Sequence, residues 1–256
     1  QKQLTCWGGN IEAYEVDGSF DDCQAMVKAA FMDEAIAKEW GLSSANSINL
    51  GRLLPQMVYY IYASSQIEAA TGKKPQIIIP SGNVGNSCGA YWAKMMGAPI
   101  GAINLALNAN RTILDYLKTG TYEPRSSIAT LANAMDVGSP SNMERLFALF
   151  GDIATMRLNV HAQSVSDETI KSTIKEIYEE DHYISCPHTA TALRVQKDGD
   201  FDGPSIAIST AHPAKFETIV EPLINKSVAI PPALEELLEK ESHYQSIGTD
   251  YRELFS

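Results

Sequence analysis

The stretch "PQIIIPSGNVGN", at residues 75–86, joins a short apolar run to a loop rich in glycine and asparagine. Three consecutive isoleucines predict a strand that is buried on both faces, as the strands of parallel sheets are. A helical pattern follows the loop and continues to about Met96. This order of elements presents main-chain N–H groups at a helix N-terminus, where they favour an anion. We therefore predict a phosphate-binding loop at residues 82–86, in which glycines allow positive φ angles and a close approach of the backbone.

This loop lacks the signatures of the common nucleotide-binding loops. No lysine stands where the pattern G-x-x-x-x-G-K-[ST] needs it, and the glycines follow G-x-x-G-x-x-x-G rather than G-x-G-x-x-G. ATP and dinucleotides are therefore disfavoured, and the single terminal phosphate of a cofactor fits the short loop better. The alternative is a glycine-rich turn between strand and helix that binds no ligand.

Strands and helices are predicted to alternate along most of the chain. Besides the strand that opens this motif, short strands are expected at residues 10–16, 100–108 and 204–210. Helices are expected at residues 19–40, 46–72, 111–120, 143–160, 167–180, 186–199 and 213–224, with an acidic, solvated helix face at 233–241. This alternation predicts an α/β fold with a mostly parallel sheet flanked by helices.

The bulk composition limits the classes of partner. The chain has 256 residues, 45% of them hydrophobic, and its net charge of -11 makes nucleic acid and anionic membranes poor partners. Four cysteines without CxxC spacing argue against a zinc ribbon or a disulfide framework. Because this metal-ligand spacing is missing, we expect no metal. The scattered cysteines suit a reducing compartment, so we expect a cytoplasmic location. No apolar run approaches the roughly 20 residues of a membrane-spanning helix.

Three further segments accompany the loop: "SANSINLGRLLPQ" at residues 44–56, "TLANAMDVGSPSNMERL" at 130–146 and "STAHPAKF" at 209–216. In this order and spacing, the four segments resemble the threonine synthase family, whose members use pyridoxal 5′-phosphate to convert O-phosphohomoserine to threonine. The resemblance implies a lyase of fold type II, similar to the β subunit of tryptophan synthase. It also implies pyridoxal 5′-phosphate as cofactor and O-phosphohomoserine as the small-molecule substrate.

The resemblance covers only the later part of the family's chain. Family members carry the lysine that bonds to the cofactor in a Phe-Lys-Asp context, and no lysine of this sequence has these neighbours. We therefore expect a fragment with an incomplete N-terminal part, which is inactive by itself. By the same resemblance, residues 1–43 are the remnant of a small domain and residues 44–256 form the large cofactor-binding domain.

The resemblance assigns two sets of residues to the cofactor. Gly82, Asn83, Val84, Gly85 and Asn86 match the family's cofactor-phosphate loop. Phe is usual in the family where Val84 stands, which matters if that ring packs near the cofactor. Thr210 matches the threonine that faces the pyridine nitrogen, where a hydroxyl donates without fixing a full positive charge.

A third set is associated with the phosphate of the substrate. Asn46, Ser47 and Arg52 match the family pattern Asn-Ser-x-Asn-x-x-Arg. The planar fork of an arginine suits two phosphate oxygens at once. Ser47 has an alternative role as a helix N-cap, since serine is common before an apolar helical run. Asn49 is expected only to brace the turn.

Other polar residues receive no catalytic role. A structural turn is favoured for the motif that holds Asn133, Asp136 and Arg145. His188 and His212 are candidates by residue type, because histidine is a common general acid or base, but each stands at a predicted helix start. Lys215 is not taken as the Schiff-base lysine, because the family has it in addition to that lysine.

Two other functions remain open. One is a non-catalytic module of the same fold that binds a phosphorylated metabolite, and the other is a related pyridoxal-phosphate lyase acting on a phosphorylated hydroxy amino acid. The sequence does not predict the oligomeric state.

Overall fold

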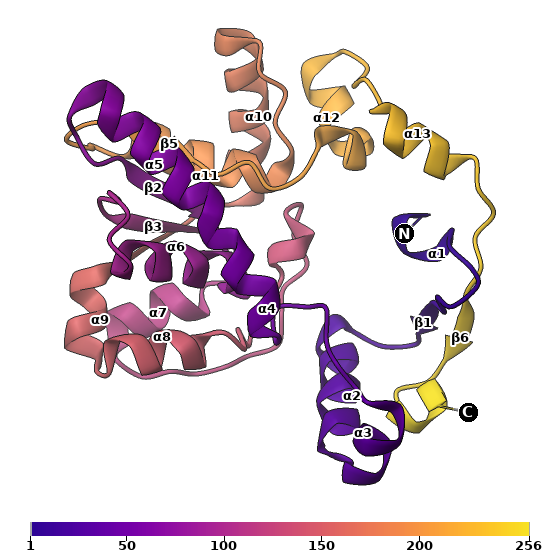
Figure 1. Cartoon of the computed structure of the whole chain (residues 1–256). Coiled ribbons are helices and arrows are strands. Elements are labelled where there is room, and N and C mark those ends of the chain that lie inside the picture. The colour runs from indigo at the N-terminus through magenta and orange to yellow at the C-terminus, as the bar shows by residue number, and fades with distance from the viewer. Residues whose placement is uncertain (1, 256) are drawn as a thin grey trace. The chain divides into compact units, whose positions relative to one another are not determined.

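The computed structural model describes residues 2–255, which form two compact units (Figure 1). One unit comprises residues 45–228, and the other combines residues 2–44 with residues 229–255. From the sequence, residues 1–43 are expected to belong to the small domain and residues 44–256, including the C-terminal segment, to the large domain. That segment instead pairs with the N-terminal one, because β1 (Tyr14–Val16) and β6 (Gln245–Ile247) form a parallel ladder.

The unit formed by the two ends of the chain is mostly helical around this ladder. Its helices are α1 (Lys2–Thr5), α2 (Phe20–Met32), α3 (Glu34–Trp40), α13 (Pro232–Leu238) and the 3-10 turn η4 (Tyr251–Phe255). The single helix predicted at residues 19–40 is two helices, because Asp33 has extended backbone angles between them. The Asp33 carboxylate caps α3 by accepting hydrogen bonds from the main-chain N–H groups of Ala35 and Ile36.

The larger unit is built on a four-stranded parallel sheet in the order β4-β3-β2-β5. Its strands are β2 (Gln76–Pro80), β3 (Ile103–Leu107), β4 (Val160–Ser164) and β5 (Ser205–Ala207). The isoleucines of β2 and all of β3 are buried, as the apolar runs predicted. β4 was missed, because the whole of residues 143–160 was predicted to be helical. Those residues form α8 (Met143–Phe150) and α9 (Ile153–Asn159), and Val160 then begins the strand.

Helices cover both faces of this sheet (Figure 1). α11 (Pro187–Asp198) packs against β2, β3 and β5, and behind it lie α10 (Asp167–Asp181) and then α12 (Glu217–Ile224). α6 (Gly85–Met95) follows β2 on the opposite face and packs against α5 (Met57–Thr71). α7 (Thr112–Thr119) packs against β4. None of the helices described at residues 2–255 is long and apolar enough to cross a bilayer.

The helix predicted at residues 46–72 is interrupted near its start. α4 (Leu50–Leu53) and the 3-10 turn η1 (Leu54–Gln56) precede α5, and Pro55 stands within η1. Leu53, Met57 and Tyr60 are buried at helical spacing, as the pattern predicted. These short elements carry the segment at residues 46–52 to the sheet edge where the site lies.

The strand order creates a switch point between β2 and β5. From β2 the chain adds β3 and β4 on one side, and it then returns to place β5 on the other side of β2. Open parallel sheets bind their ligands beyond the carboxyl ends of the strands at such a reversal. The loops at residues 81–86 and 208–210 follow the carboxyl ends of β2 and β5, so the fold directs attention to these two loops.

Candidate functional site

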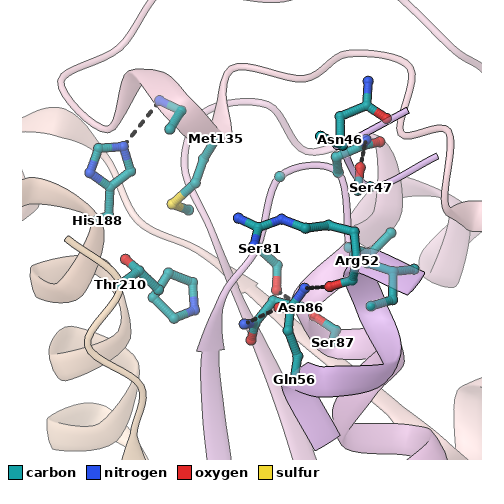
Figure 2. Close-up of a pocket in the computed structure, with 18 residues that line it drawn as sticks. Asn46, Ser47, Arg52, Gln56, Ser81, Asn86, Ser87, Met135, His188 and Thr210 are labelled. Carbon is teal, nitrogen blue, oxygen red and sulfur yellow. Dashed lines mark hydrogen bonds between the residues drawn. The ribbon is translucent and has the colours of Figure 1, made fainter. Parts of the chain in front are cut away.

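A pocket of about 480 Å³ lies at this switch point (Figure 2). That volume suits a cofactor-sized ligand, for which pockets of roughly 300–1,000 Å³ are usual. All nine residues predicted for the site line it: Asn46, Ser47, Arg52, Gly82, Asn83, Val84, Gly85, Asn86 and Thr210. The structure therefore brings together three segments that are far apart in the sequence.

The charge of the pocket differs from that of the whole chain. Among its lining residues, all of which the structure describes, Arg52 is the one permanent cation and there is no Asp or Glu. The chain as a whole has a net charge of -11. Among residues 2–255, no acidic side chain forms an ion pair with Arg52, and Figure 2 shows its side chain extending into the pocket. The pocket is therefore electrostatically suited to an anion.

The N-terminus of α6 supplies main-chain donors to this pocket. Val84 is the N-cap residue of α6, and its side chain cannot cap the helix. The first N–H groups of a helix have no intrahelical acceptor, so those of Gly85, Asn86 and Ser87 remain available where these residues line the pocket. Val84 is 2% exposed and has φ of 53°, a conformation that costs a β-branched residue about 1–3 kcal/mol. A strained turn before an uncapped helix is the geometry expected of a phosphate site.

The loop glycines are needed for close packing rather than for positive φ. Neither Gly82 nor Gly85 has a positive φ, so that part of the prediction is wrong. A Cβ atom on Gly82 would lie 2.6 Å from the Cα atom of Met135, and one on Gly85 would lie 3.0 Å from the Cβ atom of Ser47. The two glycines let the loop lie directly against the segments that form the pocket walls.

The asparagine side chains of the loop form hydrogen bonds that brace it. Asn86 accepts a hydrogen bond from the Tyr60 hydroxyl, and its Nδ2 atom donates to Gln56 Oε1 at 2.9 Å (Figure 2) and to the Tyr59 hydroxyl. These bonds attach the start of α6 to η1 and α5. Asn83 is used in the same way, toward residues 47 and 141. The donors left for a phosphate at this loop are therefore the main-chain N–H groups and the second hydrogen of Asn83 Nδ2, whose other hydrogen bonds to Ser47.

The segment at residues 46–52 forms the wall that carries Arg52. Asn46 Oδ1 accepts from the Ile48 N–H at 2.8 Å, and Asn49 Oδ1 accepts from the Gly51 N–H at 2.8 Å. Asn49 is therefore the N-cap of α4, and the alternative role of Ser47 as a helix cap is excluded. The Ser47 hydroxyl instead accepts a hydrogen bond from Asn83 Nδ2 at 3.0 Å, which joins the two predicted phosphate sites.

Thr210 and His188 lie on the other side of the pocket from Ser47 (Figure 2). Thr210 is exposed just beyond β5, and its main-chain N–H donates to Thr189 Oγ1 at 3.4 Å. His188 is 4% exposed, and its Nε2 atom accepts from the Ala134 N–H at 3.0 Å. Burial, together with the charge of Lys215, lowers the pKa of His188 to about 4, so the ring is neutral at neutral pH.

The other singled-out polar residues hold local structure. Asp136 accepts hydrogen bonds from the Thr130 N–H at 2.9 Å and from Asn108 Nδ2 at 2.7 Å, which closes the loop after residue 130. His212 accepts from the Ala214 N–H at 3.1 Å and caps the 3-10 turn Pro213–Lys215. Among residues 2–255, no cluster of His, Cys, Asp and Glu is arranged for a metal ion.

Several lining residues were not predicted from the sequence. They are the polar residues Gln56, Ser81, Ser87 and His188 and the apolar residues Ala45, Leu53, Pro80, Ala134 and Met135. Gln56 and Ser81 fall inside motifs that the sequence did single out, so their proximity to the predicted residues was the available signal. Nothing in the sequence indicates that Met135 touches Gly82, because that contact joins segments more than fifty residues apart.

The donor set fits pyridoxal phosphate. An uncapped helix N-terminus can hold a phosphate monoester by its main-chain N–H groups. A threonine hydroxyl lies across the same pocket, and the lining includes apolar groups such as Met135 and Val84 against which an aromatic ring can rest. Arg52, which forms no ion pair with any residue that the structure describes, remains for a second anionic group.

Comparisons with known proteins bear on this assignment. A family model described as "Pyridoxal-phosphate dependent enzyme" matches residues 1–209, and one described as "Threonine synthase, C-terminal" matches residues 189–254. The threonine synthase of Serratia marcescens is 41% identical over 236 residues, which cover 91% of this chain and 55% of that protein.

Solved structures agree with these matches. The crystal structure of threonine synthase from Escherichia coli has a TM-score of 0.90 at 35% identity, and the match covers 99% of this chain and 60% of that one. A pyridoxal-phosphate-bound threonine synthase from Brucella melitensis has a TM-score of 0.87 at 28% identity, with the same coverage. These findings confirm the expected fold and the resemblance to threonine synthases. The chain spans a little over half the length of the relatives it matches.

Proposed function

Because this chain belongs to the pyridoxal-phosphate dependent enzyme family, we propose that it forms the cofactor and substrate pocket of a threonine synthase. The reaction converts O-phosphohomoserine and water into threonine and phosphate. The observation that carries the proposal is a single pocket with two separate anion-binding features, the N-terminus of α6 and the wall formed by Ser47 and Arg52. An enzyme with a phosphorylated cofactor and a phosphorylated substrate needs both.

The N-terminus of α6 is the proposed site of the cofactor's phosphate. The main-chain N–H groups of Gly85, Asn86 and Ser87 donate to its oxygens, and the helix dipole favours its charge. The Thr210 hydroxyl is the proposed hydrogen-bond partner of the pyridine nitrogen. When bound, the cofactor supplies an electron-withdrawing ring that stabilises negative charge on the substrate carbons.

The wall at residues 46–52 is the proposed site of the substrate's phosphate. The Arg52 guanidinium can bind two phosphate oxygens and offset charge as the phosphate departs. Because no acidic side chain described in the structure pairs with Arg52, the guanidinium loses no ion pair on binding. The hydrogen bonds that Asn46 and Asn49 accept from main-chain N–H groups hold this wall in place.

A cytoplasmic location is part of the proposal. It is supported by the four cysteines, all of which are free thiols in the described chain. Burial raises the pKa of the Cys88 thiol to about 12, so this residue of α6 stays protonated and unreactive.

A chimera tests the proposed reaction. This chain replaces the matching region of the Escherichia coli threonine synthase, and purified chimera is assayed with O-phosphohomoserine for phosphate release and for threonine. The expected result is formation of both products in equal amounts, with activity lost in a matched chimera that carries Arg52→Met. A folded chimera that binds the cofactor but releases no phosphate argues for a non-catalytic module. Phosphate release with a keto acid in place of threonine identifies a different lyase.

A further inference from the structure

Near its C-terminal end, the motif at residues 130–146 carries two polar residues to which the proposed reaction gives no role, Asn142 and Arg145. Both lie beside the proposed substrate-phosphate wall. Arg145 donates through one nitrogen to Asn142 Oδ1 at 2.5 Å and through another to the Ile48 carbonyl oxygen at 2.8 Å. Asn142 is fully buried and donates through Nδ2 to Ser47 Oγ at 3.1 Å.

The orientation of the Asn142 amide follows from its partner. A guanidinium has only donors, so the atom of Asn142 that faces Arg145 is the carbonyl oxygen. The amide nitrogen of Asn142 therefore faces Ser47 and donates to it. The contact with Arg145 fixes this polarity.

The orientation of the Asn83 amide is fixed independently. Asn83 Oδ1 accepts from the main-chain N–H of Ser141 at 2.6 Å, and a main-chain N–H can only donate. Asn83 Nδ2 therefore faces Ser47 Oγ, at 3.0 Å, and donates to it as well. Two amides of fixed polarity thus converge on one hydroxyl.

These two bonds determine what Ser47 can offer a ligand. A serine hydroxyl has two acceptor lone pairs and one proton, and the two amides occupy both lone pairs. Within residues 2–255, no hydrogen bond is seen in which Ser47 Oγ donates, and Ser47 lines the pocket. Its proton is the remaining group, so Ser47 presents a donor and selects a ligand atom that accepts.

We propose that Asn142 and Arg145 are positioning residues that make the Ser47 hydroxyl a hydrogen-bond donor to an anionic oxygen in the pocket. The inference deepens the proposed function, because it rests on a phosphate group of the substrate binding at this wall. Arg145 also holds the backbone of the wall through the Ile48 carbonyl. The ligand class is a group whose oxygens only accept, such as a phosphate monoester dianion.

Asn142→Asp reverses the polarity with little change of shape. One carboxylate oxygen still accepts from Arg145, and the other now faces Ser47 Oγ as an acceptor. Ser47 then donates to Asp at position 142 and no longer to the pocket. Since a hydrogen bond to a charged group is lost, the affinity for inorganic phosphate is expected to fall roughly 10- to 100-fold.

The added negative charge of this variant is controlled by a double-mutant cycle. Binding of inorganic phosphate is measured by calorimetry at saturating pyridoxal phosphate for the unsubstituted chain, Asn142→Asp, Ser47→Ala and the double variant. In the Ser47→Ala background there is no proton to redirect, so Asn142→Asp is expected to cost less than about threefold. Urea unfolding establishes that each variant is folded.

The cycle decides the inference without reference to turnover. An effect of Asn142→Asp that is equally large with and without the Ser47 hydroxyl overturns it, and so does an unsubstituted chain that binds no phosphate. If Asn142→Asp does not fold, Arg145→Met replaces it in the same cycle, because its loss frees the Asn142 amide to turn. The affinity for inorganic phosphate is then expected to fall roughly threefold or more. An inactive chimera contradicts the proposed reaction but leaves this cycle, measured on the chain itself, unaffected.

Discussion

His188→Gln tests how the pocket wall formed by residues 133–136 is held. His188 is 4% exposed and accepts a hydrogen bond from the Ala134 N–H, which only the neutral ring can do through Nε2. Glutamine is also neutral and can accept the same bond through its side-chain oxygen. The substitution therefore removes the titrating group and keeps the contact.

The magnitude follows from the pKa of His188. Burial, together with the charge of Lys215, lowers this pKa from 6.5 to about 4. Above pH 6.5 neither state binds a proton there, and the contribution to stability is complete. Between pH 6.5 and 4 the unfolded state binds the proton and the folded state does not, so the free energy of unfolding decreases as the pH decreases. The difference between the pKa values of His188 in the unfolded and folded states, at about 1.36 kcal/mol per unit, amounts to about 3 kcal/mol.

The assay is urea unfolding followed by circular dichroism, at pH 7.5 and at pH 4.5, for both proteins. The unsubstituted chain should lose about 2–3 kcal/mol more than His188→Gln between these two values. Carboxyl groups also titrate over this range, but they contribute equally to both proteins and cancel in the difference. Parallel losses in the two proteins refute the structural role given to the neutral His188 ring.

Three further outcomes are expected. Gly82→Ala places a Cβ atom 2.6 Å from the Met135 backbone and should lower the free energy of unfolding by about 1–3 kcal/mol. The control Gly8→Ala, whose Cβ atom meets no atom within 4 Å, should change it by under about 0.5 kcal/mol. Equal effects of the two substitutions contradict this explanation. Tyr60→Phe removes the donor to Asn86 and should cost about 1–2 kcal/mol in the same assay, so an unchanged midpoint argues against that anchor. Arg52→Met should weaken binding of inorganic phosphate at least tenfold by calorimetry, while the control Arg111→Met, at the N-cap of α7, should leave it unchanged.

The sequence predicted the centre of the fold well, because its signals there are local. The isoleucine run of β2, the loop at residues 82–86 and the start of α6 are each defined by neighbouring residues, and they were located correctly. β4 was missed because its sequence, "VHAQS", is short and follows a helix without a break. β6 was missed for a related reason, since its three residues are strand only by pairing with β1.

The candidate site was predicted by residue type but not by geometry. The nine residues do line one pocket, yet the uses of their side chains depend on partners elsewhere in the chain. Asn86 is occupied by tyrosines of α5, and Gly82 is required by the Met135 backbone. Val84, rather than a glycine, adopts the positive φ, which no local propensity favours. Contacts over long sequence distances determine these features.

The most direct test of the account is whether the N-terminus of α6 binds the cofactor's phosphate. Main-chain amide resonances of the chain are followed by NMR during titration with pyridoxine 5′-phosphate and, separately, with pyridoxine. Neither compound has an aldehyde, so surface lysines do not react. If the phosphate binds there, the amides of Gly85, Asn86 and Ser87 shift with the phosphorylated compound and not with pyridoxine. Unshifted amides at these three residues, or equal shifts with both compounds, would contradict it.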